Sequence, residues 1–127
     1  MRYMMFIKHT EDFRREEVPP ALYEAMGEFV GRSAKEGTFI DGAGLQPSAR
    51  GHRVRLAKGK ITVLDGPFTE SKEIVGGYAL IEARSEEHAL EMAREFMEIH
   101  RVHWPQFEGE SEVRPLESEA GGPAEQE

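Results

Sequence analysis

The chain has 127 residues, of which 39% are hydrophobic and 31% charged, as expected for one globular domain. It contains no cysteine, which excludes a disulfide framework, a thiolate nucleophile and Cys-ligated metal sites. The formal net charge is −8, so we expect no nucleic-acid partner, because proteins that bind a phosphate backbone carry a basic excess. No apolar run approaches the roughly 20 residues that a bilayer requires, so we expect no membrane partner and a cytoplasmic location.

The first predicted element is a strand over Arg2–Lys8, whose apolar residues fall on both faces. A sheet with one solvated face needs apolar residues on the other face only. The second is a helix over Ala21–Lys35, because apolar residues recur there at helical spacing after two prolines. The apolar positions of this helix are Leu22, Met26, Phe29 and Val30. An irregular strand over Thr38–Leu45 follows.

A β-hairpin is predicted next, with arms His52–Leu56 and Ile61–Leu64 around Lys58-Gly59. Another strand is predicted over Tyr78–Ala83. Ser85 is a suitable N-cap for a second helix, which is expected to end near His100. The apolar stripe expected on this helix is Ala89, Leu90, Ala93, Phe96 and Met97. A short last strand covers Glu112–Arg114.

This order of elements predicts an α+β fold of the ferredoxin-like, split β-α-β kind. Its antiparallel sheet has an inserted β-hairpin, and both helices lie on one face. The other face, which carries residues such as Phe6 or Tyr3, also needs a cover, so we expect a homodimer. The domain is assigned to residues 1–116. Residues 117–127 carry four Glu and no cation, and are expected to form a disordered acidic tail.

Three motifs carry a family resemblance. Asp65-Gly66-Pro67-Phe68, followed by Lys72-Glu73 and Gly76-Gly77-Tyr78, resembles the DGPF branch of the YCII-related proteins. Gly44-Leu45-Gln46-Pro47-Ser48 and Glu112-Val113-Arg114-Pro115 match the same branch, so the likeness spans roughly Tyr3–Leu116. It implies a ferredoxin-like fold that pairs into a dimeric α/β barrel, in a bacterial cytoplasmic setting. It also implies a genomic place beside genes for extracytoplasmic-function sigma factors.

The resemblance further implies a likeness in fold to small isomerases and cofactor-free monooxygenases. A site with a helix-borne histidine and an aspartate is suggested for such relatives. This chain departs from that pattern, because its predicted first helix contains no histidine and Met26 stands about where one is sought. The aspartate of the family motif, Asp65, is the feature that can be carried over.

Asp65, His9 and Lys72 are the candidate catalytic residues. A buried Asp65 would have a raised pKa and could act as a general base or acid; alternatively, it is a turn aspartate that bonds the local backbone. His9 ends the first strand and can titrate near neutrality, so it could replace the missing helix histidine, or it is a solvated loop residue. Lys72 could bind an anionic group or stabilise an oxyanion, or belong to a solvated loop.

The candidate substrate-binding residues are Arg53, Arg55, Ser48 and Tyr78. The two arginines share a strand face and could clamp a carboxylate or phosphate, or they form the exposed face of a hairpin. His100 and His103, together with His88, supply two converging ligands at best. We therefore predict no metal and no cofactor.

Two functions are compatible with these residues. The first is a small cofactor-free enzyme that performs acid/base chemistry on a compact molecule, anionic or neutral, with Asp65 as the base and His9 or Lys72 assisting. The second is a non-catalytic ligand-binding or interaction module linked to extracytoplasmic-function sigma-factor regulation. A dry pocket around Asp65 would favour the enzyme, whereas an open polar surface there would favour the module.

Overall fold

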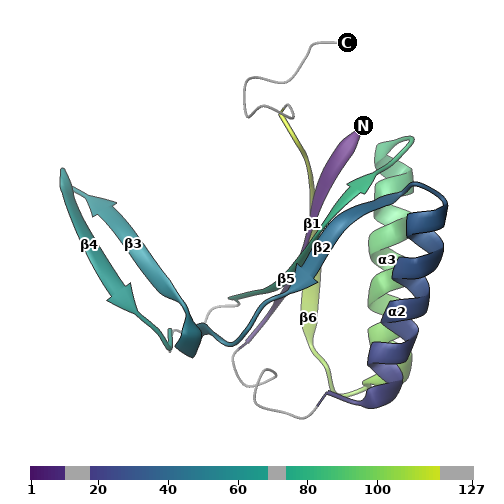
Figure 1. The fold of residues 1–127 in the computed structure, drawn as a ribbon, viewed down its shortest axis with the longest axis horizontal. Coiled ribbons are helices and arrows are strands. Elements are labelled where there is room, and N and C mark those ends of the chain that lie inside the picture. The colour runs from purple at the N-terminus through teal and green to yellow at the C-terminus, as the bar shows by residue number, and fades with distance from the viewer. Residues whose placement is uncertain (11–17, 69–73, 118–127) are drawn as a thin grey trace.

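The computed structural model describes residues 1–10, 18–68 and 74–117 (Figure 1). The elements within these ranges are β1 (Arg2–His9), α2 (Pro20–Lys35), β2 (Phe39–Gly44), the 3-10 turn η1 (Ser48–Arg50), β3 (His52–Ala57), β4 (Lys60–Asp65), β5 (Ile74–Glu82), α3 (Glu86–His103) and β6 (Gly109–Pro115). Every predicted helix and strand is present. The predicted acidic tail lies almost wholly outside the described residues.

Four of the strands form an antiparallel sheet in the order β2-β5-β1-β6. Helices α2 and α3 lie side by side on one face of this sheet (Figure 1). Each helix joins two strands that are not neighbours: β5 lies between β1 and β2, and β1 lies between β5 and β6. The predicted α+β class with an antiparallel sheet is therefore confirmed.

The core lies between the sheet and the helices. Its buried members are Tyr3, Met5, Ala79, Ile81, Ala83, Ala89, Met92 and Ala93. Tyr3 was expected on the uncovered face, but it pairs with Ile81 and points with it toward the helices. The stripe expected on α3 was wrong at Leu90, which is 54% exposed, because the helix turns Met92 inward instead.

The sheet face opposite the helices, which we call the open face, has an apolar centre. Phe6 pairs with Tyr78 and Met4 with Leu80, and all four side chains are partly exposed. Because directly opposed residues of antiparallel strands share a face, these four lie together. On β6 the same face carries Glu112, which is paired with Lys8 at 2.5 Å between Nζ and Oε1.

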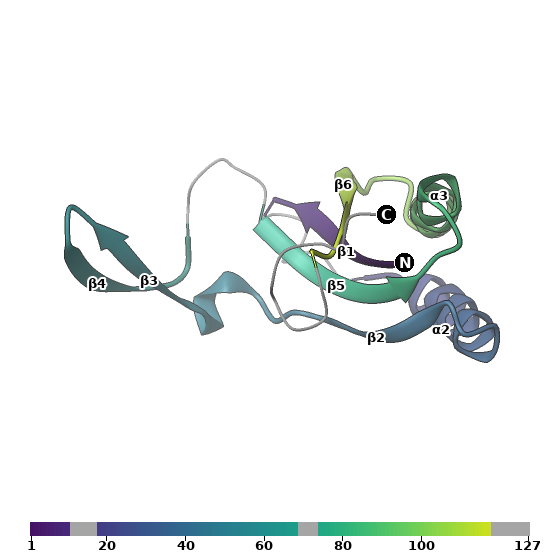
Figure 2. The same ribbon diagram turned by 90° about the horizontal axis from the view of Figure 1, so that it is seen from above.

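Strands β3 and β4 form a separate two-stranded sheet rather than joining the main one. This hairpin, which we call the arm (His52–Asp65), projects away from the sheet and helices in both views (Figures 1 and 2). The inserted hairpin predicted from the sequence is thus present, as an outward extension of the domain.

The second helix, α3, is longer than predicted. Ser85 caps α3 as predicted, since its Oγ accepts a hydrogen bond from the backbone N–H of His88 at 3.1 Å. However, α3 runs to His103, three residues beyond the expected end.

Among the described residues, no helix has the length and apolar character needed to cross a bilayer.

Candidate functional site

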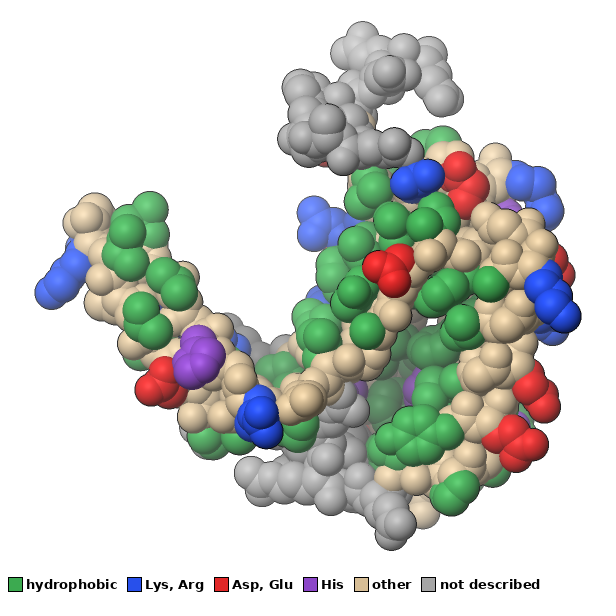
Figure 3. Space-filling view, in the orientation of Figure 1, with side chains coloured by type: hydrophobic (Ala, Val, Ile, Leu, Met, Phe, Trp, Pro, Cys, Tyr) green, Lys and Arg blue, Asp and Glu red, His purple; other side chains and the backbone are tan. Residues whose placement is uncertain are grey.

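A pocket of about 440 Å³ lies between the sheet and the helices. It is visible as a recess bordered by hydrophobic side chains between β2 and α2 (Figure 3). The lining comes from β1, β2 and β5 on the sheet side and from α2, α3 and the segment before β6 on the other. It contains no Lys, Arg, Asp or Glu among the described residues, and its two imidazoles belong to His9 and His100.

His9 enters the pocket from the last position of β1, where it is 5% exposed. Its Nδ1 lies 2.7 Å from the backbone oxygen of Thr10. A carbonyl oxygen only accepts hydrogen bonds, so Nδ1 carries a proton in this contact. In the neutral ring, Nε2 is then left as the basic nitrogen.

A β-bulge makes room for the His9 ring. Ile7 pairs with Gly77 and Lys8 with Val75, so Gly76 is the extra residue on β5. A Cβ atom at Gly76 would lie 2.0 Å from Nε2 of His9, closer than any real contact allows. The imidazole therefore occupies space that exists because residue 76 has no side chain.

His100 faces the same pocket from α3 and is 6% exposed. Its Nδ1 lies 2.9 Å from the backbone oxygen of Phe96, one helical turn earlier, so this nitrogen also carries a proton. Burial lowers the pKa of His100 below its usual range. The hydrogen bond to Phe96 opposes that shift, and the nearby His9 adds to it. Its surroundings therefore favour the neutral form of His100.

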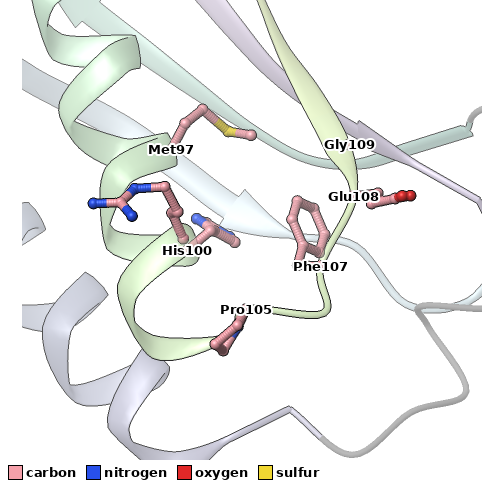
Figure 4. A pocket seen from close by; sticks show the side chains of 7 residues that line it. Met97, His100, Pro105, Phe107, Glu108 and Gly109 are labelled. Atoms are coloured by element: carbon pink, nitrogen blue, oxygen red, sulfur yellow. The ribbon is translucent and has the colours of Figure 1, made fainter.

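Phe107, just before β6, contacts both histidines. Its ring centroid lies 6.1 Å from that of His9 in an edge-on arrangement and 4.9 Å from that of His100. Figure 4 shows His100 and Phe107 facing one another from α3 and the segment before β6. They also line a second, outer hollow of about 330 Å³, so this ring pair forms the wall between the two spaces.

Three other predicted site residues meet at the base of the arm. Asp65 is 80% exposed, and its Oδ1 lies 2.8 Å from Nδ1 of His52 on the neighbouring strand. The Ser48 hydroxyl accepts a hydrogen bond from the backbone N–H of Phe68 at 3.1 Å. The Arg53 guanidinium lies 3.8 Å from the centre of the Phe68 ring. None of these residues lines the pocket.

Gly66 completes this cluster with Ser48, Arg53, Asp65 and Phe68, and we call the cluster the arm root. A Cβ atom at Gly66 would lie 1.8 Å from the backbone oxygen of Ser48, so the two backbones meet where a side chain has no room. The Gly66 N–H also donates to the oxygen of Gly51 at 3.0 Å. The Asp-Gly-Pro-Phe stretch therefore fastens the arm to η1 of the same chain.

The remaining predicted residues are dispersed. Arg55 is exposed on the arm. Tyr78 borders the pocket, but its pairing with Phe6 assigns its side chain to the open face. Lys72 lies outside the described residues. Within the described ranges, no three His, Asp or Glu side chains come together in a way that could hold a metal ion.

Sequence reasoning weighed His100 only as a metal ligand and missed it as a pocket residue. The signal was nevertheless present, because His100 follows Ala89, Ala93 and Phe96 at helical spacing on the buried stripe of α3. A histidine that continues an apolar stripe is buried with it. The segment was instead expected to be the fraying end of the helix.

The fold and the pocket define a small α+β protein with two buried imidazoles between sheet and helices. The sequence model of the YCII-related domain matches residues 1–99, and the chain belongs to this family. It is also similar to a protein of Rhizobium meliloti (strain 1021) described as "Uncharacterized protein R00369", with 36% identity over 74 residues. That match covers 58% of this chain and 56% of the relative, so it spans little more than half of each.

The lowered pKa of His100 predicts a pH dependence of stability. Below about pH 6.5 the His100 side chain binds a proton in the unfolded chain but not in the folded protein. The free energy of unfolding therefore falls as the pH drops toward the folded-state pKa of His100. We expect this group to add a slope of at most about 1.4 kcal/mol per pH unit to the free energy of unfolding. His100→Gln, which keeps a donor for the Phe96 carbonyl, should reduce the slope in urea titrations. Equal slopes in both proteins would contradict the burial argument.

The arm root predicts a local effect of Gly66→Ala. The added methyl group collides with the Ser48 backbone, so the arm should loosen while the main sheet remains folded. Amide hydrogen exchange in β3 and β4 should accelerate at least tenfold. Gly51→Ala is the matched control, because its Cβ would lie an ordinary 3.4 Å from the same oxygen. Equal exchange in the two variants would show that the close approach does not hold the arm.

Proposed function

We propose that this YCII-related protein is a small cofactor-free enzyme that moves a proton on a compact molecule bound between its sheet and its helices. The observation that supports it is the pair of buried imidazoles, His9 and His100, in one apolar pocket. Each has its Nδ1 fixed by a backbone carbonyl. Catalytic acids and bases are commonly placed in such sites, where orientation and protonation state are held by the surroundings.

The two histidines have different roles in this proposal. Neutral His100 accepts a proton from the substrate through Nε2, because its Nδ1 is already engaged as a donor. His9 offers its own Nε2 as a second acceptor, because the Thr10 carbonyl holds its Nδ1–H, and this nitrogen orients an enol hydroxyl of the substrate. Phe107 contacts both rings and restricts their movement.

The lining favours a largely apolar ligand over the anionic one considered from the sequence. The described lining residues are apolar side chains, glycines, aromatic residues and the two histidines. An isolated carboxylate or phosphate would be costly to desolvate there without a cation. A compact carbonyl compound with an apolar or aromatic body fits a space of about 440 Å³ better.

A second candidate function is ligand binding without turnover, in the role of a module linked to extracytoplasmic-function sigma-factor regulation. Two features favour binding: Asp65, the base expected from the sequence, is 80% exposed and lies outside the pocket, and neither histidine has a carboxylate beside it in the described lining. Many catalytic histidines are oriented by a carboxylate rather than a carbonyl. Turnover and binding therefore have to be measured separately.

Proton transfer can be tested with 2-indanone, a compact aromatic ketone. Binding is followed by calorimetry, and exchange of its α-protons in deuterated water is followed by NMR. We expect the protein to accelerate exchange and His100→Gln to reduce that acceleration at least tenfold with little loss of affinity, because the base is removed and the shape is kept. Binding with exchange at the buffer rate would favour the non-catalytic module.

The bulge at Gly76 provides a sharper test of His9. Gly76→Ala should displace the imidazole and reduce both indanone binding and exchange, since the new methyl carbon would lie only 2.0 Å from the position of Nε2. Gly44→Ala is the matched control, because it also borders the pocket and its Cβ would meet nothing within 4 Å. Equal ligand affinities in the two variants would remove His9 from the site.

We also propose that the domain is ferredoxin-like and that two copies pair through their open faces into a dimeric α/β barrel. The sheet order β2-β5-β1-β6 with two interleaved β-α-β units supports the first part. The apolar centre of the open face, around Phe6 and Leu80, supports the second, because a sheet with two apolar faces needs two covers.

The dimer predicts a defined response to Phe6→Gln. The wild type should have about twice the 14.4 kDa chain mass by light scattering at micromolar concentration. The substitution should weaken dimerisation at least tenfold, because a polar group would be buried at the centre of the interface. Leu90→Gln, at an exposed apolar position of α3, should leave the dimer unchanged. A monomeric wild type would overturn the pairing.

A further inference from the structure

The arm presents an apolar face that no other described residue of its own chain covers. Val54 pairs with Val63 and Leu56 with Ile61, so these four side chains lie on one face of the hairpin. They are between 65% and 71% exposed. Such a patch measures on the order of a few hundred Å², the upper end of what monomeric proteins expose.

The exposed apolar face lies on a hairpin that projects away from the main sheet, so this face gains no stability from packing on the described part of its own body (Figures 1 and 2). A two-stranded hairpin is at best marginally stable in water unless its apolar face packs against something. The arm root holds one end of the hairpin, whereas the four apolar residues lie further out along its strands. Figure 3 shows hydrophobic side chains along the arm and along the side of the body that faces it. One occupant of the space between arm and body would cover both surfaces.

The charges of the chain indicate which occupant fits. The arm carries Arg53, Arg55, Lys58 and Lys60 against Asp65, a net charge of +3. The whole chain carries −8, so the residues outside the arm carry −11. A second copy of this chain thus offers the arm an apolar sheet face and an acidic body. Because Arg53 and Arg55 lie on the arm face opposite Val54, their charge attracts the acidic body at long range, while the apolar face makes the contact.

We propose that the arm is a clasp for a second copy of this chain: the apolar face of each arm packs on the body of the partner subunit. This inference rests on the homodimer proposed above and adds a second contact surface to it. A twofold axis makes the contact reciprocal, since each subunit gives one arm and receives the other. Stable interfaces bury roughly 1,200–2,000 Å², and the two arms add their apolar faces to the area that the two open faces supply.

The test replaces Val54 and Val63 by Thr, which keeps the β-branched shape and makes the face polar. The fold of the single chain should tolerate this double variant, because both side chains are exposed there. The dissociation constant of the dimer, from sedimentation equilibrium, should rise at least tenfold. Ala57→Thr combined with Thr62→Ser is the matched control on the opposite face of the arm and should leave it unchanged.

A second measurement locates the arm in the dimer. The chain has no cysteine, so Val63→Cys and Arg55→Cys each introduce a single thiol, on opposite faces of the arm. Maleimide should label Cys at position 63 at least fivefold more slowly than Cys at position 55 at dimer-forming concentrations. The two rates should converge on dilution to the monomer.

The outcomes separate the clasp from the dimer itself. The clasp is overturned, and the sheet pairing stands, if Phe6→Gln weakens the dimer while the Val54→Thr/Val63→Thr variant keeps the wild-type affinity. Equal labelling of the two thiols would accompany that result. A wild type that is monomeric throughout overturns both. The Val54→Thr/Val63→Thr variant could also keep the dimer affinity but lose binding to duplex DNA or to anionic lipid vesicles. That result would assign the arm to that partner and overturn the clasp.

Discussion

Strand β1 pairs with β5 along its whole length, and the one irregularity in that pairing determines where the candidate site lies. Before the bulge, strict alternation sends Tyr3 and Met5 into the core and Met4 and Phe6 to the open face. At the bulge, the extra residue Gly76 leaves room beside β1, and the ring of His9 fills it. The register of two central strands thus fixes the core, the uncovered face and the buried imidazole together.

The same pairing explains why one chain leaves apolar surface uncovered. A central strand with apolar residues on both faces needs a cover on each, and the two helices provide one. The arm repeats the pattern on a smaller scale, since its Arg53 face lies against Phe68 while its Val54 face is bare. Both bare surfaces border the same side of the body (Figure 3). The proposed reciprocal contact between two copies would cover them in a single association step.

The sequence was sufficient for the fold class and for most of the elements, because helical and strand periodicities differ strongly over these segments. It placed the start of β5 four residues late, since two glycines interrupt the apolar pattern, although Gly77 pairs with Ile7 and Gly76 forms the bulge of the same strand. It could not show that the hairpin leaves the main sheet, because the strands of an inserted hairpin have the same local pattern in either position. That choice depends on tertiary packing.

The candidate site was harder to predict than the fold for a related reason. His9 could be chosen as a candidate from the sequence because a strand end is a local feature, whereas its position in one pocket with His100 depends on how α3 lies across the sheet. The resemblance to the family directed attention to Asp65, which in one chain belongs to the arm root.

The role of the family motif follows from this placement. Gly66 has no room for a side chain against Ser48, and Phe68 is held by the same serine and by Arg53. Each of these contacts sets the angle at which the arm leaves the body. In this protein the motif lies in the arm root, apart from the pocket between sheet and helices. The proposed clasp and the proposed ligand site therefore use separate segments of the chain.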